Sequence, residues 1–161
     1  MVSAAASKAS APGGCAGPPP AELLRGVRQF NRREFFECHE TLEALWKREA
    51  GEVRYLYQGI LLVGVGFYHL DRGNRVGSRK CLRRGIACLL RVAPVCQGVR
   101  AGQLAAEAVE AMATLEGRGW EDLGGLGSAL IPTIQIELGS EGMGDSEGST
   151  RGESIVKDKR R

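Results

Sequence analysis

The chain has 161 residues, of which 43% are hydrophobic, and this is enough for one ordinary core in a single domain. A formal net charge of +3 is too small to indicate a partner by itself. The longest apolar run, residues 60–68, is far too short to span a membrane. Leu, Ala and Arg are abundant whereas β-branched runs are scarce, which predicts an all-α fold.

Both ends of the chain lack a pattern that could form a core. Residues 1–20 are rich in Ala, Ser, Gly and Pro, and residues 139–161 mix glycine with charge. We therefore expect a disordered N-terminal segment 1–20, a helical domain 21–138 and a disordered C-terminal tail 139–161. The lack of acidic residues in the first segment is also compatible with the end of an organelle transit peptide. Cytoplasm and plastid stroma are therefore both expected locations.

Five helices are predicted between the two ends, over residues 21–30, 33–50, 53–71, 75–93 and 103–115. The third is apolar almost all round, so we expect it to be the central helix. Its three glycines, Gly59, Gly64 and Gly66, indicate the close approach of a neighbouring helix. Residues 123–136 are broken by glycine and proline, and we expect them to wrap around the bundle.

A faint internal repeat supports an arrangement in hairpins. Aligning Asn31 with Asn74, an offset of 43 residues, also superposes Cys38 on Cys81. Each unit would be a helix, a turn at the asparagine and a second helix. The sequence therefore predicts stacked helical hairpins.

The second predicted helix carries two ionisable residues on its apolar stripe. His39 and Glu43 are one turn apart and share that stripe with Trp46. Such residues are expected to be at least partly buried and to need partners. Trp46 is interpreted as a core anchor. Glu40 lies to one side of the stripe and would serve as a base only if the helix held a metal, as in metalloproteases.

Two residues of the central helix extend this polar cluster. Gln58 and His69 are eleven residues apart and point in nearly the same direction. If the two helices pack antiparallel, His39, Glu43, Gln58 and His69 would converge. One interpretation is a buried hydrogen-bond network that fixes the register of the helices. The other is a small-ligand pocket or a divalent-metal site held by His39, Glu43 and His69.

Several motifs carry a family resemblance. They are FN at residues 30–31, CHETLEALW at 38–46, YQG at 57–59, YHLDRGN at 68–74 and GSRKCLRRGIACL at 77–89. Over about Leu24 to Ala93 this pattern resembles the bacterial and plastid family known as domain of unknown function 309. The resemblance implies a small all-helical domain whose signature is the His-Glu-x-x-Glu helix. It implies no established reaction.

A second candidate surface is basic. Between Asp71 and Arg100 there are eight basic residues and one acid. The residues that we assign to a polyanion-binding face are Arg72, Arg75, Arg79, Arg83 and Arg84. The alternative is a solvated face paired with the acids of the second helix, or an Arg79 that reaches inward to Glu43 or Glu40. The predicted helix lacks aromatic residues for base stacking, which disfavours specific RNA recognition.

The five cysteines are an odd number without a CxxC pair. This pattern predicts free thiols in a reducing intracellular compartment, with Cys81 and Cys88 as small inward-facing residues. The overall expectation is a soluble binding or scaffolding module without a membrane segment, with a protein or anionic partner on its basic helix. A metal-dependent hydrolase and a polyanion- or RNA-binding protein are the alternatives.

Overall fold

The computed structural model describes residues 13–120 and 127–138, and these form an all-α domain. Five helices make up the bundle: α1 (Ala21–Asn31), α2 (Phe35–Arg48), α3 (Arg54–Asp71), α4 (Arg75–Arg91) and α5 (Ala101–Arg118). A 3-10 helix (Gly14–Ala16) precedes them, and a short α6 (Gly127–Leu130) follows. The predicted fold class is therefore confirmed, with each long helix within a few residues of its expected bounds. None of the described helices is long and apolar enough to cross a membrane.

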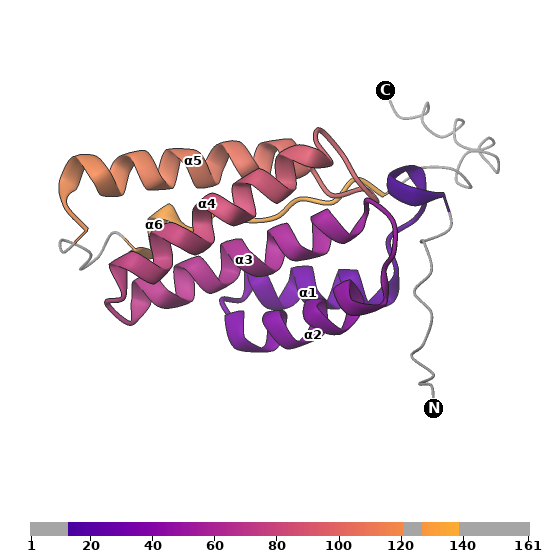
Figure 1. Ribbon diagram of the computed structural model, residues 1–161, viewed down its shortest axis with the longest axis horizontal. Helices are drawn as coiled ribbons and strands as arrows, with labels where there is room; N and C mark the ends of the chain where they lie inside the picture. The colour runs from indigo at the N-terminus through magenta and orange to yellow at the C-terminus, as the bar shows by residue number, and fades with distance from the viewer. Residues whose placement is uncertain (1–12, 121–126, 139–161) are drawn as a thin grey trace, which may run out of the picture.

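The central position of α3 is also confirmed. It packs against α2 on one side and α4 on the other, and α5 covers α4 (Figure 1). Leu56, Ile60 and Val63 of α3 are fully buried. The predicted close approach at its glycines is present, because a methyl group on Gly59 would lie 2.7 Å from the Leu89 side chain of α4.

The hairpins α1–α2 and α3–α4 correspond at an offset of 40 residues, and not at the predicted offset of 43. A methyl group on Gly26 would lie 2.7 Å from Leu42, and one on Gly66 would lie 2.7 Å from Leu82, which is the same contact in the hairpins α1–α2 and α3–α4. The turns correspond as well: Arg33 (φ 67°) and Gly73 (φ 76°) are both left-handed. Identity at the asparagines misled the alignment, since Asn31 ends a helix whereas Asn74 caps the next one.

Residues 127–138 run back along the bundle, as predicted for this part of the segment 123–136, whereas residues 123–126 lie outside the described residues. We call residues 131–138 the return segment (Figure 1). Asn31 holds it by two hydrogen bonds: its side-chain amide donates to the Ile134 carbonyl (3.1 Å), and its Oδ1 accepts from the Ile134 N–H (2.8 Å). Isolated bridges join Val99 to Cys96 and to Ile136. The return segment thus connects α1 to the loop before α5.

The N-terminal segment differs from its prediction. Residues 1–12 and 139–161 lie outside the described residues, but residues 13–20 are ordered and Cys15 is bonded to Cys96. The Gln97 N–H also donates to the Cys15 carbonyl at 2.7 Å. The prediction of disorder was wrong for residues 13–20. It rested on amino-acid composition, which gives no indication that Cys15 is bonded to a distant loop.

Candidate functional site

His39 and Glu43 form a pair at the surface of α2. The distance between His39 Nε2 and Glu43 Oε1 is 3.7 Å, and Lys47 Nζ lies 3.1 Å from the other Glu43 oxygen. The two side chains are 37% and 35% exposed. The stripe that α2 buries is Phe35, Cys38, Thr41, Leu42 and Leu45. His39 and Glu43 lie beside that stripe, so they are only partly buried.

Gln58 and His69 do not join this pair, so the predicted convergence was wrong. The Cys88 thiol donates to Gln58 Oε1 at 3.6 Å, and His69 Nδ1 lies 3.3 Å from the Asn74 side-chain amide. These partners belong to α4 and its N-terminal cap, which shows that this stripe of α3 faces α4. Among the described residues no three His, Cys, Asp or Glu side chains are grouped to hold a metal ion. The metal set His39, Glu43 and His69 is therefore not assembled.

The remaining members of the predicted cluster are placed separately. Trp46 is half-buried and packs against the core, as expected for an anchor. Glu40 is exposed and lines a shallow hollow of about 430 Å³ on α1 and α2, together with Arg25. Among the described residues it belongs to no group of metal-ligating side chains.

The free thiols offer no activated nucleophile. Burial raises the pKa of Cys38 to about 12, and burial also raises the pKa values of Cys81 and Cys88. A thiol of raised pKa is protonated at neutral pH and reacts poorly. Cys81 and Cys88 are half-buried, in keeping with their predicted role as small packing residues.

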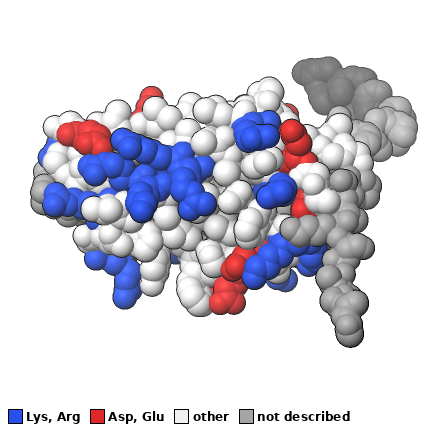
Figure 2. Space-filling model, in the orientation of Figure 1, with Lys and Arg blue, Asp and Glu red and all other residues white. Residues whose placement is uncertain are grey.

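The basic surface is the more substantial site. Figure 2 shows Lys and Arg side chains gathered over α4, with few acids among them. Lys80, Arg83 and Arg84 are all exposed, and none of them forms an ion pair with a carboxylate in the described part of the chain. No ion pair among the described residues joins this face to an acid of α2, and Glu43 pairs instead with His39 and Lys47. We call Lys80, Arg83 and Arg84 the basic face of α4.

The other predicted basic residues have local partners. Arg72 lies 5.2 Å from the centre of the Tyr68 ring. Arg75 also has partners, so it is not counted in the basic face. Arg79 donates from Nε to Glu116 Oε2 at 3.0 Å, and its guanidinium lies 4.8 Å from the centre of the Trp120 ring. Arg79 therefore joins α4 to α5 and does not reach Glu43 or Glu40.

A groove runs beside the basic face. It has a volume of about 750 Å³, and its lining residues are Arg79, Arg83, Ile86, Val109, Met112, Ala113 and Glu116. These come from one stripe of α4 and one stripe of α5, and we call this hollow the α4–α5 groove. The Arg79–Glu116 ion pair lies across one end, and the hydrogen bond from Arg79 lowers the pKa of Glu116. We call its apolar lining residues the floor of the groove and its charged lining residues the rim.

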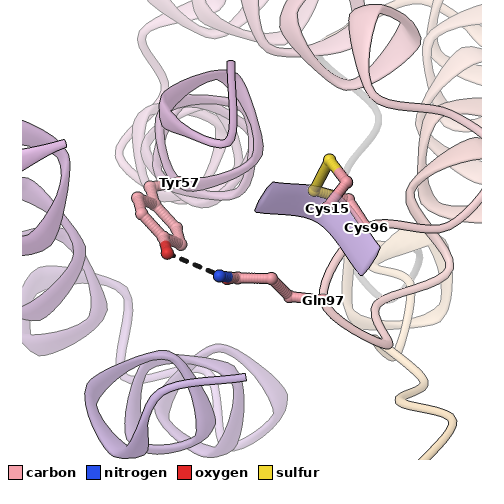
Figure 3. Close-up of a disulfide and its surroundings, with 4 residues drawn as sticks. All are labelled: Cys15, Tyr57, Cys96 and Gln97. Atoms are coloured by element: carbon pink, nitrogen blue, oxygen red, sulfur yellow. Dashed lines mark hydrogen bonds between the residues drawn. A yellow bond between two sulfur atoms is a disulfide. The ribbon is translucent and has the colours of Figure 1, made fainter. Parts of the chain in front are cut away.

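A buried polar pair was missed by the sequence reasoning. The Tyr57 hydroxyl donates to Gln97 Oε1 at 2.8 Å, and both residues are 1% exposed. Figure 3 shows Tyr57 pointing from α3 toward the loop that carries Gln97, beside the disulfide. Burial raises the pKa of Tyr57 to about 12. Tyrosine inside an apolar helix needs such a partner, but no sequence pattern indicates a loop residue 40 positions away.

The disulfide between Cys15 and Cys96 contradicts the prediction that all five cysteines are free thiols. The partners are 81 residues apart and follow no spacing rule. Only the fold brings them together, because the segment before α1 passes the loop between α4 and α5. The other three cysteines are free as expected.

Comparison with known proteins gives a family match that includes the His-Glu-x-x-Glu helix, α2. Residues 23–81 match the family model described as domain of unknown function (DUF309). The predicted resemblance is confirmed over this DUF309 segment. The uncharacterized protein YpuF of Bacillus subtilis (strain 168) is 36% identical over 58 residues, which cover 35% of this chain and 33% of that relative. The match thus spans about a third of the length of the curated relative.

The extent of the DUF309 match separates two parts of the molecule. It covers α1, α2, α3 and the first turns of α4, as well as the His39–Glu43 pair. Most of the basic face, including Arg83 and Arg84, and all of α5 lie beyond residue 81. The α4–α5 groove therefore combines one residue of the DUF309 segment, Arg79, with residues that follow it.

Proposed function

We propose that this protein is a binding module that recognises an anionic partner through the basic face of α4. The observation that carries the proposal is the exposure of Lys80, Arg83 and Arg84 on one helix, with no described carboxylate paired to them. Cations held on a rigid helix with few acids among them attract anionic surfaces and steer their approach. Arg84 and Lys80 are four residues apart and Arg83 is adjacent, so all three charges act over about one helical turn.

The alternative of a metal-dependent hydrolase receives less support from the described residues. His39 and Glu43 lie at the surface, and His69 pairs with Asn74 instead of joining them. Hydrolysis of the metalloprotease type requires at least three ligands around one ion and a base nearby. The binding proposal requires only side chains that are already exposed.

The test compares two triple variants of the full chain. Lys80→Gln/Arg83→Gln/Arg84→Gln removes the basic face, and Arg25→Gln/Arg28→Gln/Arg32→Gln removes three exposed charges from α1 and its C-cap. Helix α1 does not contact α4 closely. The probe is fluorescein-labelled poly-L-glutamate, followed by anisotropy over a range of salt concentrations. We expect the first variant to lose most of its affinity and salt dependence, and the second to lose little.

Thermal melts of both variants check that each remains folded. Equal losses in the two variants would mean that only net charge matters, and the proposal would then fail. Unfolding of the first variant alone would show that these side chains are structural, and this result would also contradict it.

A further inference from the structure

The α4–α5 groove adds apolar surface to the basic face, and we infer that its occupant is an acidic amphipathic helix of a partner protein. This inference rests on the proposed function and names the class of partner. Helices that bind in grooves do so by placing an apolar stripe on the floor while flanking charges meet the rim. The groove has both parts: Ile86, Val109 and Met112 on the floor, and Arg83 on the rim.

The stripe of α4 that faces outward is longer than the groove itself. Its members are three or four residues apart and combine three apolar residues with two arginines: Val76, Arg79, Arg83, Ile86 and Leu90. Val76 is 65% exposed and Leu90 is 59% exposed. Such spacing keeps all five side chains on one side of the helix. At 1.5 Å per residue the stripe is about 21 Å long, which matches a partner helix of about four turns.

No described segment covers the side of the groove formed by α5. Val109 is 49% exposed, Met112 is half-buried, and Ala113, which follows Met112, is small and exposed. The return segment does not cover these residues, since it borders α5 along Ala111 and Thr114. Arg79 near the start of α4 pairs with Glu116 near the end of α5, so the two helices are antiparallel (Figure 1). A third helix lying along the groove would contact both.

The residues that line the α4–α5 groove determine which class of partner it can bind. No aromatic residue lines the groove, so it offers no platform for stacking a nucleic-acid base. Aliphatic side chains beside cations complement leucines beside glutamates. The Glu116 carboxylate is already held by Arg79, which leaves Arg83, Arg84 and Lys80 as the cations for a partner. An acidic helix with an apolar stripe satisfies both requirements, whereas a purely polar polyanion leaves the floor exposed to water.

Two synthetic peptides of the same composition test the inference on the full chain. Both are about 15 residues long and contain Leu, Glu and Ala. One has its leucines on a single helical stripe, and the other has them distributed around the helix. Anisotropy with labelled peptides should show that the striped peptide binds about tenfold more tightly, because only its leucines can reach the floor together.

Variants of the protein then distinguish the contribution of the apolar floor to peptide binding from that of the charged residues. Val109→Ser should abolish most of the preference for the striped peptide and leave binding of the distributed peptide unchanged. Phe36→Ser, which removes a 60% exposed apolar residue from α2, is the matched control and should alter neither. Arg83→Gln/Arg84→Gln should weaken both peptides, because each carries the same glutamates.

Each other outcome overturns the inference in a distinct way. Equal affinity for the two peptides, with both weakened by Arg83→Gln/Arg84→Gln, would leave the proposed function standing and remove the groove from it. Failure of both peptides to bind would contradict the proposed function as well. A single-stranded oligothymidylate that binds more tightly than either peptide would identify nucleic acid as the partner. Self-association of the wild type that Val109→Ser abolishes, measured by sedimentation, would identify a second copy of the chain.

Discussion

The Tyr57 hydroxyl and the Gln97 side chain are joined by a hydrogen bond of 2.8 Å in a place where both residues are 1% exposed. This bond connects the central helix α3 to the loop before α5. Gln97 is itself held by its backbone, with φ at 48° and its N–H donating to Cys15. The pair therefore links three parts of the chain that are remote in sequence.

We expect Tyr57→Phe to destabilise the protein, because it leaves Gln97 Oε1 buried without a donor. A stranded buried acceptor costs about 1–3 kcal/mol. Urea unfolding followed by circular dichroism would measure the loss. Tyr68→Phe is the matched control, since Tyr68 is 36% exposed and should change the free energy of unfolding little. A Tyr57→Phe variant as stable as the wild type would show that water replaces the bond.

Stability should fall in alkaline solution through the same tyrosine. Burial raises the pKa of Tyr57 from 10.0 to about 12 in the folded state, so between these values the unfolded chain releases a proton that the folded chain retains. The stabilising effect is fully present below pH 10 and is lost as the pH rises toward 12. Urea midpoints measured across this window should fall less steeply in Tyr57→Phe than in the wild type. Parallel slopes would contradict the assignment.

Reduction of the Cys15–Cys96 disulfide should lower the melting temperature. The bond closes a loop of 81 residues, and a crosslink of this size typically stabilises a folded domain by about 2–4 kcal/mol. Melts with and without reductant, and of Cys15→Ser, would measure the loss. Cys15→Ser should be insensitive to reductant. A wild type that melts identically in both conditions would show that the bond contributes nothing to stability.

The repeated glycine–leucine contact predicts equal sensitivity in the two hairpins. Gly26→Ala and Gly66→Ala each place a methyl group 2.7 Å from a buried leucine, and overpacking of this kind costs about 1–3 kcal/mol. Gly117→Ala is the control, because nothing lies within 4 Å of the added methyl group in α5. Removing a glycine from an exposed helix should stabilise that variant by up to about 1 kcal/mol. Thermal melts compare all three.

His39→Ala should have a small effect. Breaking a buried ion pair would lower the free energy of unfolding by several kcal/mol. His39 and Glu43, however, are about one-third exposed and 3.7 Å apart. Exposed ion pairs on a helix contribute about 0.3–0.5 kcal/mol. We therefore expect a loss below about 1 kcal/mol in urea unfolding. A loss as large as that of Tyr57→Phe would mean that His39 supports the core in a way that its exposure does not show.

The fold could be predicted because its determinants are local. Helix bounds follow from apolar spacing and from breakers such as Pro94, and the glycines of α3 indicated close packing. The arrangement of the polar residues could not be predicted, and His39 and His69 have no partner in common. It depends on how α2 is rotated against α3, which is set by the packing of buried residues such as Phe35, Cys38 and Leu42. The basic residues of α4 could be predicted from the sequence, but their ion-pair partners could not. Arg79, for example, pairs with Glu116, which is 37 positions away.

The two hydrogen bonds from Asn31 to Ile134 bear on the order in which the chain is made. Asn31 is synthesised 103 residues before the partner that satisfies its side chain. During translation the first hairpin therefore leaves the ribosome without this partner, and water must hydrate the asparagine until the last part of the domain has emerged. The α1–α2 hairpin reaches its final structure only at the end of synthesis, so a nascent chain stalled before residue 134 would hold α1 and α2 in a looser state than the finished protein.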